Sequence, residues 1–294
     1  MTADVYPAAG LVQRAAAAFA ASVPEQPADD GYFGPASMTW RLNGDLSAPV
    51  AGLRSLLMQA LHPLAMAGVD QHSDWRADPA GRLASTSAYL VTITYGDRAA
   101  ARRAADRVRT IHQRVRGTDP VTGRPYAASD RDLLIWVHAA LVDSVLAAAD
   151  RYGTPVSAAG KDRYVAEMTA AAELVGVPAG RAPSTTAELD AYFTAVRPEL
   201  TFSPIAAEST GALLDAFAVD IDFADFWQQI ADAAFASMPQ WVRDMYGYSA
   251  ESRTDREEVR QVLGVLDALY LGEPGVLEAR QRIELRSRAA TGNA

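Results

Sequence analysis

Four histidines are the side chains in this sequence best suited to bind a metal ion or move a proton near neutral pH. They are His62, His72, His112 and His138, and no histidine follows in the second half of the chain. Cysteine is absent, which excludes disulfides, thiolate nucleophiles, iron–sulfur clusters and thiolate-bound haem. A metal would therefore depend on these histidines or on carboxylate, Tyr, Met or Lys side chains.

His112 has the most suggestive surroundings of the four. Val108 and Val115 lie four residues before it and three after it, so on a helix they form an apolar stripe beside the imidazole. Arg109 and Arg116 flank the same ridge and can reach an acidic group at its rim. Such a wall suits a haem, which needs one nitrogen ligand, an apolar slot and cations for its propionates. An ordinary amphipathic helix with solvated arginines also fits the pattern.

A second pair of polar residues precedes this segment. Arg82 and Thr86 are four residues apart and therefore share one face of a helix. A guanidinium beside a hydroxyl can hold a propionate or polarise a bound oxygen species. The alternative is a surface arginine and a threonine that hydrogen-bonds to its own helical turn.

The other three histidines each have a structural interpretation as well. His62 precedes Pro63 and can be a half-buried helix residue, whereas His72 can form a hydrogen bond within a loop. His138 lies within the apolar stretch LLIWVHAAL and can be a core histidine with its polar atoms satisfied.

Composition and motif searches exclude several functions. The net charge of -9 offers no surplus of Lys or Arg for binding a nucleic-acid backbone, so the expected partners are small, neutral or hydrophobic molecules. The sequence contains no G-x-S-x-G elbow, dinucleotide-binding G-x-G-x-x-G after a strand, Walker loop or H-E-x-x-H motif. It also lacks the paired Glu-x-x-His motifs of a di-iron bundle.

Apolar positions recur every three or four residues, which predicts an all-α fold without a sheet. Residues 117–126 contain two prolines and two glycines and are predicted to form a surface loop. No break resembles a flexible linker, so we expect one domain over 1–294, with a polar, frayed tail after about residue 288. The predicted helices are 8–22, 47–67, 79–95, 97–116, 130–152, 157–175, 185–196, 207–219, 222–246 and 254–271.

The sequence also bears on where the protein works. Asp4 and Arg14 interrupt the N-terminal apolar stretch, so a secretory signal is not expected. No uncharged apolar run reaches about 18 residues, which argues against a membrane-spanning helix. A cytoplasmic protein is the resulting expectation.

Several ordered motifs resemble those of one known family. The chain is similar to the MpaB-like oxygenases, relatives of the latex-clearing rubber oxygenases, from about residue 32 to about residue 200, with C-terminal helices at about 207–288 expected to pack on this core. The motifs are GPASMTWRLNGD, RSLLMQALHPLAMAGVDQHS, DPAGRLASTSAYL, Tyr95–Gly96, VRTIHQRVRG and YAASDRDLLIWVHAALVDSVL.

The resemblance implies a haem b protein with a globin-like helical core and additional helices. The helix histidine that binds iron in the family falls on His112, and the Arg-x-x-Lys-Thr motif of the rubber oxygenases is matched by Arg82 and Thr86. Ser85 replaces the lysine, which can occupy the other face of the iron in the rubber enzymes, so the sixth position is open or assigned elsewhere. His62 is the preferred distal or alternative ligand, followed by His138.

The function expected from the resemblance is a haem-dependent oxygenase or dehydrogenase that acts on a hydrophobic small molecule with O₂ or peroxide. Two alternatives belong to other classes. One is a haem-binding sensor or carrier in which His112 holds iron without turnover, and the other is a helical scaffold without a cofactor.

Overall fold

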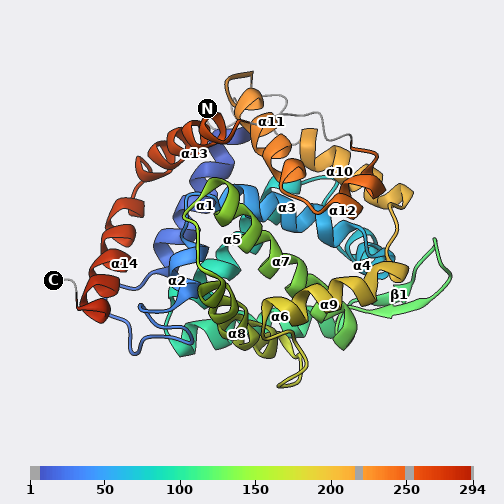
Figure 1. Ribbon diagram of the computed structural model, residues 1–294, viewed down its shortest axis with the longest axis horizontal. Coiled ribbons are helices and arrows are strands. Elements are labelled where there is room, and N and C mark those ends of the chain that lie inside the picture. The colour runs from blue at the N-terminus through green and yellow to red at the C-terminus, as the bar shows by residue number, and fades with distance from the viewer. Residues whose placement is uncertain (1–6, 216–220, 249–254, 293–294) are drawn as a thin grey trace.

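The computed structural model describes residues 7–215, 221–248 and 255–292, which form fourteen α-helices, one short 3-10 helix and one β-hairpin (Figure 1). The prediction of an all-α protein is confirmed, apart from the hairpin. The helices are α1 (Pro7–Ser22), α2 (Met38–Asn43), α3 (Ala48–Ala60), α4 (Pro63–His72), α5 (Pro79–Tyr95), α6 (Arg98–Arg114), α7 (Arg131–Tyr152), α8 (Ala158–Val175), α9 (Thr186–Val196), α10 (Pro204–Asp215), α11 (Ile221–Ala236), α12 (Gln240–Tyr246), α13 (Arg256–Leu271) and α14 (Val276–Thr291), with η1 (Arg197–Glu199) after α9.

Aspartate side chains begin the two helices that carry most of the predicted site. The Asp78 carboxylate accepts a hydrogen bond from the Gly81 amide at 2.7 Å at the start of α5. Asp97 accepts one from the Ala100 amide, also at 2.7 Å, at the start of α6. Each cap satisfies an amide that has no partner within its helix, and so fixes where the helix begins.

Two prolines divide segments that periodicity predicts as single helices. The predicted helix 47–67 is wrong in its extent because the chain breaks at His62, whose backbone is extended before Pro63. The predicted helix 222–246 likewise divides at Pro239, between α11 and α12. The short α2 and the C-terminal α14 have no counterpart among the predicted helices, and α14 extends beyond residue 288 into the expected tail.

A β-hairpin occupies the segment that was predicted to be only a loop. Strands β1 (Arg116–Thr118) and β2 (Pro125–Ala127) pair in an antiparallel manner, with Gly117 opposite Tyr126. The Tyr126 hydroxyl donates to Oε1 of Gln71 at 2.8 Å, which joins the hairpin to α4. A Cβ atom at Gly117 would lie 2.7 Å from both atoms of that hydrogen bond, so a larger residue there would displace one of the two side chains.

Helix α7 runs through the middle of the molecule, with α3 packed along it, while α14 follows one outer edge and the hairpin projects on the other (Figure 1). Of the described helices, α7 alone is long and apolar enough to cross a membrane by length and composition. Within the protein, however, 72% of its most apolar window is buried, as expected of a core helix. The globin-like arrangement and the single domain stay predictions.

Candidate functional site

The amphipathic helices enclose an apolar cavity of about 520 Å³, which lies within the usual size range of small-molecule sites. Its walls come from α3, α4, α5, α6, α7, α8 and α10, together with the hairpin. Three of the four histidines line it, namely His72, His112 and His138. The structure therefore brings together residues that are up to 66 positions apart in the sequence.

Helix α6 contributes the face predicted from the spacing around His112. Val108 and Ile111 on α6 and Val115, just after its end, line the cavity together with the imidazole, as expected for positions three or four residues apart. His112 is half-buried, and its Nδ1 atom is buried with no hydrogen-bond partner among the residues that the structure describes. Burial lowers the pKa of His112, so the ring is neutral near pH 7 and has a lone pair available for a ligand.

A second neutral imidazole reaches the cavity from α7. His138 is only 7% exposed, and its Nε2 atom has no hydrogen-bond partner. Desolvation lowers the pKa of His138 to about 4, because the apolar surroundings disfavour the charged ring. The structure thus does not give His138 the satisfied polar environment of an ordinary core histidine.

The wall formed by α5 contains the arginine and threonine of the predicted pair. The Arg82 guanidinium donates to the Ser73 hydroxyl at 2.7 Å, and within the described ranges no carboxylate lies at ion-pair distance from it. Burial lowers the pKa of Arg82. The Thr86 hydroxyl donates to the Arg82 carbonyl oxygen at 3.1 Å, which is the hydrogen bond within its own turn that the sequence analysis left open.

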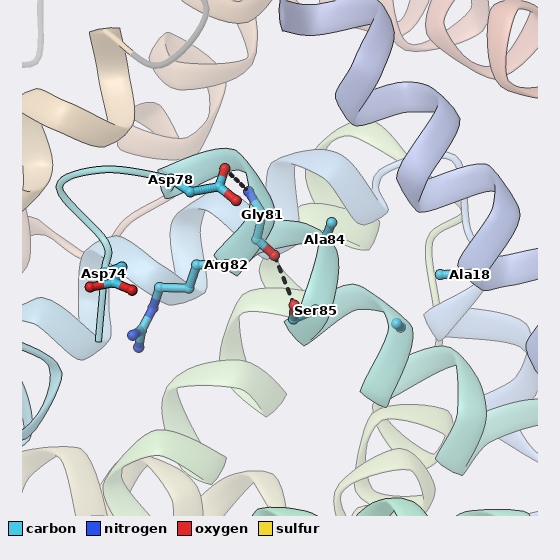
Figure 2. Close-up of a pocket in the computed structure, with 8 residues that line it drawn as sticks. Ala18, Asp74, Asp78, Gly81, Arg82, Ala84 and Ser85 are labelled. Carbon is cyan, nitrogen blue, oxygen red and sulfur yellow. Dashed lines mark hydrogen bonds between the residues drawn. The ribbon is translucent and has the colours of Figure 1, made fainter. Parts of the chain in front are cut away.

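A second hollow of about 540 Å³ lies on the other side of α5, against α1. Figure 2 shows the residues at its rim, where Ser85 donates to the Gly81 carbonyl oxygen at 2.8 Å. Arg82 and Ser85 line this hollow and the apolar cavity as well, so they separate the two spaces. The full lining comprises Ala18, Asp74, Asp78, Gly81, Arg82, Ala84, Ser85 and Ala88.

The cavity gathers buried polar atoms that have no partner in the described part of the chain. Besides His112 and His138, they are Nε1 of Trp75 and the hydroxyl of Tyr89. Neither residue was predicted from the sequence to belong to the site. Tyr89 follows Arg82 by seven residues, so extending the helical period by one turn would have found it. Trp75 precedes α5 in an irregular segment and carries no periodic signal.

Other predicted site residues lie outside the cavity lining. His62 is 5% exposed and sits beside Trp136, with a ring-centre distance of 6.1 Å. Arg109 forms an ion pair with Asp106 on its own helix. Neither His62 nor Arg109 is therefore placed to contact an occupant of this cavity.

Arg116 is not part of the helix on which the sequence analysis placed it. Helix α6 ends at Arg114, and Arg116 begins β1 instead, so the predicted helical ridge is wrong at this position. Its guanidinium donates to the Gln113 carbonyl oxygen at 2.5 Å. Its own carbonyl oxygen lies 3.2 Å from Nε2 of His72, which can donate to it. His72 thus helps to hold the hairpin against α4.

Two exposed apolar side chains mark where the cavity meets the surface. Ile111 on α6 is 58% exposed and Val137 on α7 is 40% exposed, and both belong to the lining. Apolar side chains at this opening favour the entry of an apolar molecule.

The histidines do not form a conventional metal-binding cluster. In the part of the chain that the structure describes, no three His, Asp or Glu side chains lie close enough together to hold a metal ion. A metal that brings its own macrocycle needs only one axial side chain from the protein, and His112 supplies a neutral imidazole without another partner. The residues of this cavity therefore fit a haem better than a bare metal ion.

A family model described as "ER-bound oxygenase mpaB/B'/Rubber oxygenase, catalytic domain" matches residues 40–268. The chain belongs to this family. The match to the MpaB/rubber oxygenase domain extends well beyond residue 200, where the similarity was predicted to end, and it includes every helix that lines the cavity. No curated protein and no solved structure matches the chain.

Proposed function

We propose that this member of the MpaB/rubber oxygenase family is a haem b-dependent oxygenase that oxidises a hydrophobic small molecule with O₂ or peroxide. The observation that carries the proposal is the half-buried, neutral imidazole of His112, whose Nδ1 has no partner, in the wall of an apolar cavity. Family membership supports oxygenase chemistry in general. A haem would account for one imidazole that has, among the described residues, no cluster of further ligands around it.

In this proposal His112 would hold the iron of the haem, and Arg82 would pair with one of its propionates. Bound haem would supply an iron centre that reacts with O₂ or peroxide. Arg82 suits its role because its guanidinium has a hydroxyl partner but no carboxylate in the described structure. The apolar side chains around the two residues exclude water and bind the hydrocarbon part of the substrate.

His138 takes the place that the sequence analysis gave first to His62. As a neutral imidazole with an unpaired Nε2 it can accept a proton or a hydrogen bond within the cavity. His62 does not line the same space, so it cannot do so without a rearrangement of α4. Ser85, in the position of the rubber-oxygenase lysine, has its hydroxyl bonded to Gly81.

Absorption spectra of the protein titrated with haem test the proposal. We expect a Soret band in the wild type, its loss in His112→Ala and its retention in His62→Ala. Retention in His112→Ala, or loss only in His62→Ala, would refute the assignment of the iron ligand. Protein that stays colourless after haem is added would favour a scaffold without a cofactor.

A turnover experiment separates the enzyme from a haem sensor or carrier. The haem-loaded protein is exposed to O₂ or peroxide with a panel of apolar compounds, and products are detected by mass spectrometry. Oxygen incorporated into a compound supports the oxygenase. Stable, reversible spectral changes without any product support the carrier, and removal of hydrogen without oxygen incorporation supports a dehydrogenase.

A further inference from the structure

Tyr89 is half-buried, and its buried hydroxyl differs from those of several other tyrosines in having no partner among the described residues. The hydroxyls of Tyr95 and Tyr246 donate to the carbonyl oxygens of Trp40 and Leu57 at 3.0 and 2.7 Å. That of Tyr164 donates to Oδ1 of Asn43 at 2.9 Å. In these three cases the phenol holds two parts of the fold together. The Tyr89 hydroxyl makes no such bond within the described residues.

Tyr126 provides the contrast within the cavity itself. Tyr126 and Tyr89 both line the space, yet the Tyr126 hydroxyl donates to Gln71 at 2.8 Å. The cavity therefore contains one phenol that fastens the hairpin and another that has no structural hydrogen bond. Burying a hydroxyl without a hydrogen bond is unfavourable, so such a group is retained where a ligand satisfies it.

The position of Tyr89 places this free donor beside the other polar groups of α5. Tyr89 lies three residues after Thr86 and seven after Arg82, on one face of the helix. Leu90 and Ile93 continue the wall as apolar contacts. Burial also raises the pKa of Tyr89, so the phenol keeps its proton over the physiological pH range and acts as a donor.

We propose that Tyr89 is the donor by which the cavity recognises an oxygen atom of its substrate, and that the substrate is an apolar molecule with a hydrogen-bond-accepting oxygen such as a ketone. The inference deepens the proposed function. It rests on that function in one respect, because it takes this cavity as the substrate site. An apolar substrate without such an oxygen would leave the phenol unsatisfied, and that difference provides specificity.

The test compares two probes of nearly equal size, 1-tetralone and tetralin, which differ by one ketone oxygen. Their affinities are measured by calorimetry on the haem-loaded protein. We expect 1-tetralone to bind about 5- to 10-fold more tightly than tetralin to the wild type, the effect of one neutral hydrogen bond. Tyr89→Phe should abolish this preference while leaving the affinity for tetralin unchanged.

Tyr126→Phe is the matched control because it removes a hydroxyl from the same cavity that already has a protein partner. It should keep the preference for 1-tetralone. The proposal is overturned if the ketone confers no advantage in the wild type, if Tyr89→Phe retains the advantage, or if neither probe binds.

Haem affinity is measured in parallel for all three proteins. A weaker hold on haem in Tyr89→Phe, with the preference for the ketone intact, would assign the phenol to a propionate and overturn the proposal. If the wild type binds no haem, the proposed function fails. The same calorimetric comparison on the purified protein still decides whether Tyr89 donates a hydrogen bond to a ligand oxygen.

Discussion

Two arginines, one in the core and one in the cavity wall, have very different numbers of partners within the protein. Arg54, on α3, is 1% exposed and has an ion pair to Asp143 at 2.6 Å, with hydrogen bonds to Ser144 at 2.7 Å and to the Ser237 carbonyl oxygen at 3.3 Å. Arg82 lines the cavity with one hydroxyl partner and, in the described residues, no ion pair.

The difference separates groups that build the fold from groups that are available to a ligand. The core network around Arg54 joins α3, α7 and the segment after α11. Its polar groups therefore already have hydrogen-bond or ion-pair partners within the protein. The cavity leaves polar atoms of Trp75, Tyr89, His112 and His138 without partners. Substitutions should therefore affect stability in the first region and binding in the second.

The largest effect is expected from Arg54→Ala. Removing the guanidinium leaves Asp143 without its partner and should lower the free energy of unfolding by about 3 kcal/mol. Arg82→Ala loses only one hydrogen bond and should cost about 1 kcal/mol or less. Urea unfolding of the two variants measures both values. Equal losses would show that Arg82 is as structural as Arg54 and would break the comparison.

The neutral, buried imidazole of His138 should make the free energy of unfolding depend on pH in the acid range. Its pKa in the folded protein, about 4, is below the unfolded value of 6.5, so the unfolded state binds more protons between these values. Stability is therefore complete above pH 6.5 and falls as the pH drops toward 4, by up to about 3 kcal/mol from this group.

His138→Leu should flatten this pH dependence in urea unfolding measured without a ligand. It should leave a smaller slope, because burial also lowers the pKa values of His62 and His112. An unchanged slope in His138→Leu would mean that the ring is not buried as a neutral group.

A smaller difference is expected between two tyrosines that each lose one oxygen atom. Tyr95→Phe removes the hydrogen bond to the Trp40 carbonyl oxygen and should cost about 1 kcal/mol. Tyr89→Phe removes an unpaired hydroxyl and should be neutral or slightly stabilising. Thermal unfolding of the two variants without a ligand sharpens the comparison, which fails if Tyr89→Phe is the more destabilised protein.

Sequence periodicity predicted much of the wall that contains His112, because the contacts along one helix repeat every three or four residues. Val108 and Val115 lie beside the imidazole as expected, and Arg82 and Thr86 share the cavity-facing side of α5. The same rule could not choose between His62 and His138. Both lie in apolar stretches, and only the packing of α4 and α7 decides which one reaches the cavity.

Spacing along one helix did not predict the partners of Arg109 or the residue at which α6 ends. Arg109 lies three residues before His112, yet it forms an ion pair with Asp106 and donates to the Leu174 carbonyl oxygen on α8 at 3.2 Å. The end of α6 was placed two residues too late, which moved Arg116 from a helix to a strand. Local spacing contains no information about an acceptor that a distant helix supplies.

The smallest effect is expected from Thr86→Val. The hydroxyl already donates its one proton to the Arg82 carbonyl oxygen, so it is not available as a donor to a ligand. Stability should change by less than about 0.5 kcal/mol. We expect the turnover of the haem-loaded enzyme to change by less than about 3-fold, in contrast to a larger loss in Arg82→Ala. A large loss in Thr86→Val would restore the catalytic role suggested by the sequence.

The cavity wall extends from Leu56 on α3 to Leu213 on α10, which has a consequence for how the protein matures. The ribosome adds residues one at a time, at roughly 5–20 per second, so α7 and its apolar surface emerge well before α10. A nascent chain that ends within α9 lacks Ser209, Thr210 and Leu213, and its binding space is still open on that side. The cavity is therefore complete only after α10 has been synthesised and has packed against the other walls.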